Sequence, residues 1–398
     1  MIFMVSTDYK NVEAAENRLN ELKISVVDKR LILAFKDQLA AENLTVGRQA
    51  KYIYTLGRIA QMMNGTNFKQ ANKQDIVKLV ATINNNSDFK EWTKYNYLVI
   101  IRRFYKWLRQ SDDYPKEVKW IHPRIKQHKR TMPKELLTFD DIKNLTNATN
   151  NLRDRTFILL LYETGARIGE ILGLKVKDVE FDQYGAKVGL QGKTGYRKIR
   201  IISSAPAISN WLTQHPDRNN ENGLLFCGIG NFKYGARLEY QSFRKVLRKT
   251  AKKIGLRKPI NPHHFRHSRA TELAKKLTEA QLCKYMGWQI GSKEAATYVH
   301  LSGRDIDDKI LALHGLKEEE KTEDLMKPIE CPRCQIKNDP ASKFCSGCSL
   351  GLDEKSILEY DQEKEEATKF GFDMQKIVDN PQFRLAIMNI LSEEGLKK

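Results

Sequence analysis

The chain has 398 residues, enough for two or three domains, and carries a formal net charge of +19. This excess of Lys and Arg indicates a polyanionic partner, most simply nucleic acid, although a basic protein without such a partner is the alternative. The longest apolar run, residues 157–162, is far shorter than the roughly 20 residues that span a bilayer. The N-terminus becomes polar too early for a secretory signal, so we expect a reducing, cytoplasmic (nucleoid-associated) protein with no membrane contact.

Residues 1–30 show no clear pattern and are expected to be an N-terminal extension, whereas residues 31–111 are predicted to form a helical domain. Apolar spacing predicts helices over 43–63, capped by Thr45, then over 73–83 and 91–110. The outer face of the last helix carries four cations, Arg102, Arg103, Lys106 and Arg109. Binding of DNA phosphates and an ordinary solvated face are equally open interpretations of these side chains.

Residues 112–135 lose this periodicity, and three prolines there favour extended chain. We therefore predict a linker between domains. Its basic side chains suit a path along a phosphate backbone, and those expected to contact DNA are Arg124, Lys126, Lys129 and Arg130.

A second domain is predicted over residues 136–316, opening with a helix cap at Thr138 in which Asp141 takes the third position. A strongly apolar helix is expected over 153–172, and it contains Arg167. An arginine in such a segment is costly unless its charge is matched. A structural salt bridge with Glu163 or Glu170 is therefore an alternative to a functional role.

Residues 185–203 change to short alternating runs joined by a glycine-containing turn, which predicts a β-hairpin. Lys193 stands where the first strand gives way to the turn, and a lysine there is by itself usually solvated surface. Helices are then predicted over 206–215 and 241–254, with a short strand at 224–227 between them. One more amphipathic helix is expected over 303–316.

The stretch from His263 to His300 places a histidine, an arginine, a tryptophan and a tyrosine on consecutive short helices. A phenol titrates near ~10, so Tyr298 is a poor nucleophile unless cationic donors surround a phosphate. Planar guanidinium groups match the phosphate oxygens, and the leaving alkoxide needs a proton from a positioned acid. Candidates for these tasks are Arg167 and Arg266 as phosphate ligands, Lys193 as acid, His263 as proton handler and Trp288 as an indole N–H donor.

Each of these side chains also has a plainer interpretation. Tyr298 could be a core tyrosine. His263 and His267 lie four residues apart on a helix, a spacing that could instead hold a metal ion. Spacing alone compels none of the catalytic roles.

The motifs together, in this order, resemble the tyrosine recombinase (phage integrase) family. They are Thr-Gly-Ala-Arg at 164–167, Gly-Lys-Thr-Gly at 192–195, His-His-Phe-Arg-His at 263–267, Met-Gly-Trp at 286–288 and Tyr-Val-His at 298–300. The resemblance is specific over the second domain and weak over the first. Two departures are Met286-Gly287-Trp288, where the family more often has Leu-Gly-His, and Ser268, where threonine is frequent.

This resemblance implies a mainly α-helical fold with a small antiparallel β-sheet: a core-binding domain over 31–111 and a mixed α+β catalytic domain over 136–316. It implies that Arg167 and Arg266 clamp the scissile phosphate, that Lys193 protonates the leaving 5′ oxygen and that His263 assists proton transfer. Tyr298 would attack to form a 3′-phosphotyrosyl link, with no ATP and no catalytic metal. The family works on double-stranded DNA as a tetramer on two sites, through a four-way junction, and a C-terminal helix (here 305–316 or 382–391) commonly docks on a neighbour.

Four cysteines form two Cys-x2-Cys units, with Cys331 and Cys334 in the first and Cys345 and Cys348 in the second. This spacing is typical of a tetrahedral, structural zinc site, and we predict a zinc ribbon over 327–352. Two disulfides or a redox pair are the alternatives. Most recombinases lack such a ribbon, although archaeal integrase-like proteins can carry one. An acidic segment and a C-terminal helix are expected over 353–398.

The leading hypothesis is therefore a site-specific recombinase or integrase of a mobile element. Three other functions stay open. They are a catalytically inactive DNA-binding regulator of the same fold, a type IB topoisomerase-like enzyme that relaxes DNA, and a metal-dependent nuclease that uses His263 and His267.

Overall fold

The structure of the protein is a computed structural model. It describes residues 11–125, 135–192, 195–230, 234–301 and 326–358, with short pieces at 311, 314–315 and between 361 and 369. The chain divides into two compact units, Met1–Thr131 and Met132–Lys398. Most described residues are helical, and the strands form small antiparallel sheets, which confirms the predicted fold class. No helix among the described residues is long and apolar enough to cross a membrane.

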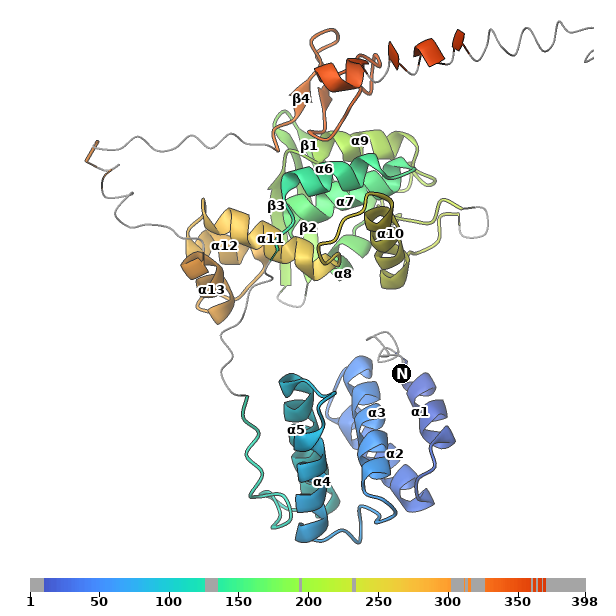
Figure 1. The fold of residues 1–398 in the computed structure, drawn as a ribbon, viewed down its shortest axis with the longest axis vertical. Coiled ribbons are helices and arrows are strands. Elements are labelled where there is room, and N and C mark those ends of the chain that lie inside the picture. The colour runs from blue at the N-terminus through green and yellow to red at the C-terminus, as the bar shows by residue number, and fades with distance from the viewer. Residues whose placement is uncertain are drawn as a thin grey trace, which may run out of the picture. The chain divides into compact units, whose positions relative to one another are not determined.

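The described part of the first unit is a set of packed helices (Figure 1): α1 (Val12–Glu21), α2 (Val26–Ala41), α3 (Val46–Met62), α4 (Lys73–Asn85) and α5 (Glu91–Leu108). The helices predicted over 43–63, 73–83 and 91–110 are confirmed as α3, α4 and α5. Helix α4 begins with a full capping box between Asn72 and Asp75. Thr45 does precede α3, but its side chain makes no capping hydrogen bond.

The helical unit extends beyond the bounds of 31–111 that the sequence predicts. Ala15 and Leu19 on α1 are buried in the same core as α3 and α5, so the expected N-terminal extension contributes a packed helix. Val118 and Ile121, in the expected linker, are also buried there. Polar residues separate these few apolar positions, and for this reason the sequence pattern did not reveal them.

The second unit begins with α6 (Phe139–Asn147), α7 (Leu152–Thr164) and α8 (Ile168–Leu172). A sheet in the order β1-β2-β3 follows, from β1 (Val179–Asp182), β2 (Gly185–Gly192) and β3 (Gly195–Ile201). Then come α9 (Ala205–Thr213), α10 (Tyr240–Lys253), α11 (Pro262–Ala274), α12 (Glu279–Met286) and α13 (Lys293–Leu301). Nearly every residue of α7 is buried, because α6, α9 and α11 pack around it (Figure 1).

Thr138 and Asp141 form the predicted capping box at the start of α6. The hairpin is confirmed, with Gly192 opposite Gly195, and β1 adds a third strand that the sequence did not suggest. The predicted strand at 224–227 is reduced to isolated bridges, one between Lys175 and Leu224 and one between Cys227 and Arg237.

The prediction of a single helix over 153–172 is wrong, because the helix ends at Gly165 and a second, short helix begins at Ile168. This glycine adopts the left-handed conformation, with φ at +55°, and ends α7. A Cβ atom there would lie 3.0 Å from Met286 Cε and 3.2 Å from Arg269 Cβ. The close approach of α11 and α12 therefore requires a glycine, and the break separates Arg167 from the buried helix.

The ribbon follows within the same unit, with β4 (Ile329–Glu330) antiparallel to β5 (Lys337–Asn338). Met326 and Ala341 are buried in the core that surrounds α7, so the ribbon and the catalytic domain share apolar contacts. The helices expected over 303–316 and 382–391 lie outside the described residues, apart from isolated positions.

Candidate active site

Arg167 follows the break at Gly165 and stands at the N-terminus of α8. Its Nη1 donates to Glu170 Oε1 at 3.0 Å, and its backbone N–H donates to Glu170 Oε2 at 3.0 Å. The salt bridge with Glu170 that was weighed from the sequence is therefore present, whereas Glu163 instead accepts hydrogen bonds from the backbone at 202–204. A third of the Arg167 side chain stays exposed, so its guanidinium can still meet a ligand.

Glu170 is buried and accepts from two guanidinium groups, those of Arg167 and Arg197. Burial by itself raises the pKa of this carboxyl. The hydrogen bonds and charges of Arg197 and Arg167 lower it by more than burial raises it, so the net pKa lies below the ordinary value. A Cβ atom at Gly192 would lie 2.2 Å from Glu170 Oε1. The end of strand β2 therefore packs directly on the carboxylate that orients Arg167.

Arg197 on strand β3 is a site residue that the sequence reasoning missed. Its Nη2 donates to Glu170 Oε2 at 2.7 Å, and its Nε donates to the carbonyl oxygen of Tyr285 at 3.0 Å. It thus connects the hairpin with α8 and with the end of α12. The signal lay in the strand alternation, since Arg197, Ile199 and Ile201 occupy the inward positions of β3.

Arg266 on α11 is buried beside both helix breaks. Its Nη1 donates to the carbonyl oxygen of Gly165 at 2.9 Å and its Nη2 to that of Met286 at 2.7 Å, while its guanidinium carbon lies 5.1 Å from the centre of the Trp288 ring. Burial, and next the positive charge of Arg167, lower the pKa of Arg266 to about 10. The group stays protonated at neutral pH, and its hydrogen bond to Gly165, two residues before Arg167, keeps the two arginines close together.

His263 lies at the exposed start of α11, one turn before Arg266. Partial burial lowers the pKa of its imidazole, and the charges of Arg266 and Arg167 lower it further. It therefore stands near both arginines as a neutral ring at pH 7. Trp288 follows Gly287, which ends α12 in the left-handed conformation with φ at +63°.

Tyr298 on α13 is buried between an indole and an imidazole. Its ring is stacked on Trp288, with centroids 5.3 Å apart and planes at 10°. Its hydroxyl forms a hydrogen bond with Nδ1 of His267. The sequence suggested for His267 only the alternative role of binding a metal ion together with His263. Among the described residues, the site thus joins Arg167, His263, Arg266, Trp288 and Tyr298 from α8, α11, α12 and α13. Lys193 lies outside the described residues, between strands paired up to Gly192 and Gly195.

The cations predicted to contact DNA differ in their surroundings. Arg103 pairs with Glu42, and all three donor groups of Arg109 are used, on Glu117 and on the carbonyls of Lys69 and Ala71. Arg102 and Lys106 lie over the ring of Tyr114, at 3.7 and 5.9 Å from its centre. Arg124 is exposed. Lys126, Lys129 and Arg130 lie outside the described residues.

The four cysteines of the ribbon come together as the spacing predicts. The Sγ atoms of Cys331, Cys334, Cys345 and Cys348 all lie within 4.8 Å of one another, and two of the pairs are 3.5 and 3.4 Å apart. A tetrahedral zinc with Zn–S bonds of about 2.3 Å separates its sulfurs by roughly 3.8 Å, so the residues fit this ion. In the part of the chain that the structure describes, no other group of three or more His, Cys, Asp or Glu side chains offers a metal site.

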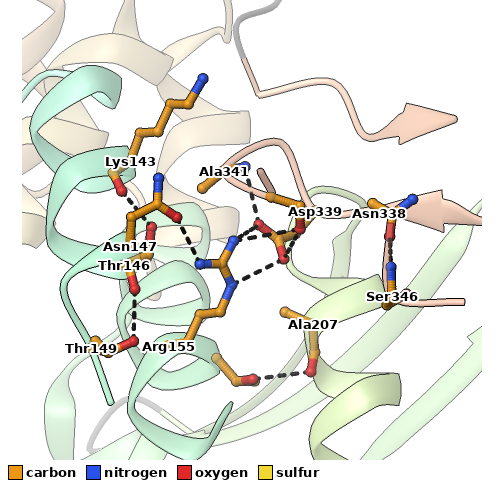
Figure 2. A network of polar contacts seen from close by, with 12 residues as sticks. Lys143, Thr146, Asn147, Thr149, Arg155, Ala207, Asn338, Asp339, Ala341 and Ser346 are labelled. Atoms are coloured by element: carbon orange, nitrogen blue, oxygen red, sulfur yellow. Dashed lines mark hydrogen bonds and ion pairs between the residues drawn. The ribbon is translucent and has the colours of Figure 1, made fainter. Parts of the chain in front are cut away.

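The ribbon is attached to the catalytic domain by a polar contact with α7 (Figure 2). Arg155 donates from Nη2 to Asp339 Oδ1 at 2.8 Å, and its Nη1 donates to Asn147 at 2.9 Å. The neighbouring Asn338 accepts from the backbone N–H of Ser346 at 2.8 Å and donates to Cys345 Sγ at 3.6 Å. Asn338, which binds a loop of the cysteine cluster, is therefore adjacent to Asp339, which anchors the ribbon.

Residues 135–304 match the phage integrase family. Among curated proteins, the chain is similar to the tyrosine recombinase XerC of Corynebacterium glutamicum, at 25% identity over 215 residues. That stretch covers 51% of this chain and 66% of the relative, so the similarity spans less than two thirds of either protein.

Solved structures of recombinases share the fold. XerH recombinase bound to its difH substrate superposes with a TM-score of 0.54 at 18% identity, over 80% of this chain and 99% of that one. A lambda integrase tetramer bound to a Holliday junction gives 0.54 at 14% identity, over 73% and 82%. The arginine pair, the tryptophan and the buried tyrosine all lie within residues 135–304, so this part of the chain is a phage integrase family domain.

Proposed function

We propose that this protein is a site-specific recombinase that cuts and rejoins duplex DNA through Tyr298. The observation that carries the proposal is the stacking of Tyr298 on Trp288, within the same cluster as the buried guanidinium of Arg266. A buried phenol beside a cationic phosphate ligand is the arrangement that attack on a phosphodiester requires.

In the proposed reaction, the oxygen of Tyr298 forms a bond to phosphorus and the bond from phosphorus to the 5′ oxygen breaks. Arg167 and Arg266 bind the non-bridging oxygens, because guanidinium N–H groups match their geometry and charge. Lys193 gives a proton to the 5′ oxygen, and His263, neutral and beside both arginines, assists proton transfer. The 3′-phosphotyrosyl ester conserves the free energy of the broken phosphodiester bond, so religation by a 5′ hydroxyl needs neither ATP nor a catalytic metal.

We infer that the substrate is double-stranded DNA and that four copies act on two sites through a four-way junction. The net charge of +19 supports a DNA partner. The likeness to a recombinase tetramer on a Holliday junction supports the assembly. The N-terminal helical unit and the basic residues after it are proposed to close around the duplex.

The four cysteines are proposed to bind one structural zinc ion. The donor set of four thiolates, brought together within 4.8 Å, supports this assignment. Four protein ligands fill a tetrahedral shell and leave no position for substrate, so the ion supplies fold stability and no chemistry.

The test begins by finding the DNA site. The protein is incubated in Mg²⁺-free buffer with a library of nicked duplexes of random sequence. The mixture is then denatured, and the DNA that stays covalently attached to the protein is sequenced. Wild type should capture one sequence class, whereas Tyr298→Phe should capture none. Capture by the phenylalanine variant would refute the role of Tyr298, and absence of any covalent product from wild type would favour an inactive DNA-binding regulator.

Two further outcomes would contradict the proposal. A requirement for Mg²⁺, without a covalent product, would identify a nuclease. Relaxation of plasmids that lack the captured sequence would identify a topoisomerase-like enzyme.

A further inference from the structure

His267 is the residue that contacts the reactive oxygen of Tyr298. It lies on α11 directly after Arg266 and one turn beyond His263, and its Nδ1 is hydrogen-bonded to the phenol oxygen. The two rings have centroids 5.9 Å apart, and Trp288 covers the tyrosine ring at 5.3 Å. The phenol oxygen is therefore directed at an imidazole nitrogen.

The surroundings of His267 favour a neutral ring. The titratable and charged groups that act on it are His263, His264 and Arg266 on its own helix and Glu294 on α13. Burial, followed by the three groups on α11, lowers the pKa of His267, and the carboxylate of Glu294 opposes this only in part. A neutral imidazole has one accepting nitrogen, and a phenol has one proton to donate. In the tautomer with the imidazole proton on Nε2, Nδ1 accepts the hydrogen bond that Tyr298 donates, and this is the arrangement that proton transfer to His267 requires.

We propose that His267 is the general base that accepts the proton of Tyr298 as its oxygen attacks the phosphodiester. This inference rests on the proposed function. The Tyr298 O–H bond breaks and its proton moves to Nδ1, which makes His267 an imidazolium. The new O–P bond forms as the P–O5′ bond breaks, and the 5′ oxygen takes its proton separately from Lys193. In religation His267 returns its proton to the phenolate.

This assignment divides the work between two histidines on one helix. The ring centroids of His263 and His267 are 6.4 Å apart. His263 lies beside the phosphate ligands Arg266 and Arg167, whereas His267 contacts the nucleophile. One face of α11 therefore supplies Arg266 as a phosphate ligand, His263 beside the phosphate and His267 as the base for Tyr298.

A substrate with sulfur in place of the 5′ bridging oxygen distinguishes two roles for a residue: a base that deprotonates Tyr298 and an acid that protonates the leaving group. A thiolate leaves without a proton, so loss of the acid is tolerated with sulfur, and loss of the base is not. Using the captured duplex, we expect His267→Ala to slow single-turnover cleavage about 10²- to 10³-fold with both oxygen and sulfur, the range usual for acid–base catalysis. Lys193→Ala should be slow with oxygen and restored by sulfur.

His267→Gln is the matched variant, because its side-chain oxygen can accept the phenol hydrogen bond but cannot take the proton. We expect it to be as slow as His267→Ala, and we expect added imidazole to restore part of the rate of the alanine variant. Full activity in His267→Gln would show that the residue only positions Tyr298. Faster cleavage by His267→Ala would show that the hydrogen bond from His267 holds Tyr298 in an inactive position. Rescue of this variant by the sulfur substrate would show that His267 protonates the leaving group. Each of these outcomes overturns the proposal.

Histidine ¹⁵N NMR of the full-length protein reports on the contact without DNA. Wild type should show a hydrogen-bonded, unprotonated Nδ1 for His267, and Tyr298→Phe should shift it. A protonated Nδ1 in wild type at neutral pH would refute the base. If no duplex is ever captured, the proposed function fails, while this measurement still decides the state of His267.

Discussion

Arg197 on β3 donates from Nη2 to Glu170 Oε2 at 2.7 Å, and the same carboxylate accepts from Arg167. The hairpin that flanks Lys193 is thereby connected to the turn that carries Arg167. Because the Arg197 Nε also binds the carbonyl of Tyr285, this one guanidinium fixes three separate chain segments in relation to one another.

Glu170→Gln should destabilise the catalytic unit, since it leaves the buried charge of Arg197 without its counter-ion. Breaking one partner of a buried pair costs about 3–5 kcal/mol. Urea unfolding of the full chain measures this change. Glu180→Gln is the control, because its pair with Lys198 is exposed and such pairs contribute about 0–1 kcal/mol. Equal losses in the two variants would contradict a structural role for the buried pair.

The same carboxylate makes the stability depend on acid pH. Burial opposes ionisation of Glu170, but Arg197 and Arg167 lower its folded-state pKa below the ordinary value. Its contribution is therefore complete above the unfolded pKa, near 4.3, and is lost as pH falls through the lower folded pKa. Unfolding free energies measured across this range should fall more steeply with acid in wild type than in Glu170→Gln. Parallel curves would assign the acid sensitivity to other carboxyl groups.

Gly287→Ala should disturb Arg197 as well as the backbone. Its φ of +63° disfavours a side chain, and a Cβ atom there would lie 2.7 Å from Arg197 Nη1. Gly255→Ala is the matched control, because its φ is +66° and a Cβ atom there would meet nothing within 4 Å. We expect about 1–2 kcal/mol of destabilisation in the control from the backbone alone, and a larger loss, with slower DNA cleavage, in Gly287→Ala. Similar values in both would mean that Arg197 can move at no cost.

Zinc binding should stabilise the attachment of the ribbon to α7. Asn338 binds a loop of the cysteine cluster, and its neighbour Asp339 binds Arg155. Cys345→Ser should therefore lower the zinc content from one ion per chain and also increase amide hydrogen exchange in α6 and α7. Asp339→Asn should increase exchange at the same helices while the zinc content stays at one. A zinc-free Cys345→Ser protein with unchanged exchange in α7 would show that the two parts are independent.

Arg109 and Arg124 should differ in their effect on DNA binding. The donors of Arg109 are occupied by Glu117 and two carbonyls, so Arg109→Ala should lower the unfolding free energy of the helical unit and leave the salt dependence of binding unchanged. Arg124 is exposed, and Arg124→Ala should reduce the slope of log K against log salt by about 1. Affinities for the captured duplex at several salt concentrations measure both slopes. An equal reduction by both variants would contradict this distinction.

The sequence predicted those features that local patterns determine. Apolar spacing located α3, α4 and α5, alternation located the hairpin, and the pairing of cysteines located the cluster. It did not predict the end of α7 at Gly165, because apolar residues recur at helical spacing beyond it, at Ile168 and Ile171, and the approach of Met286 and Arg269 appears only in the folded protein.

Residues that act through distant partners were also missed. In the sequence, nothing distinguishes Arg197 from any other arginine on a strand. Its role depends on Glu170, which lies 27 positions earlier and contacts it only in the folded protein. His267 was considered with His263, four residues away, whereas its contact is with Tyr298, 31 positions later. Helical spacing reveals neighbours on one element, and contacts between elements depend on how they pack.

Two carbonyl oxygens, from Gly165 and Met286, are the groups that hold Arg266 in its buried position. Within the described ranges no carboxylate lies at ion-pair distance from this guanidinium, and the charge of Glu170 compensates it only in part. A phosphodiester would supply the missing charge, and DNA binding would then also complete the fold of the site. Every phosphate in a duplex offers the same charge, so Arg266 cannot tell one position from another, and the choice of where to cut must be made elsewhere on the protein.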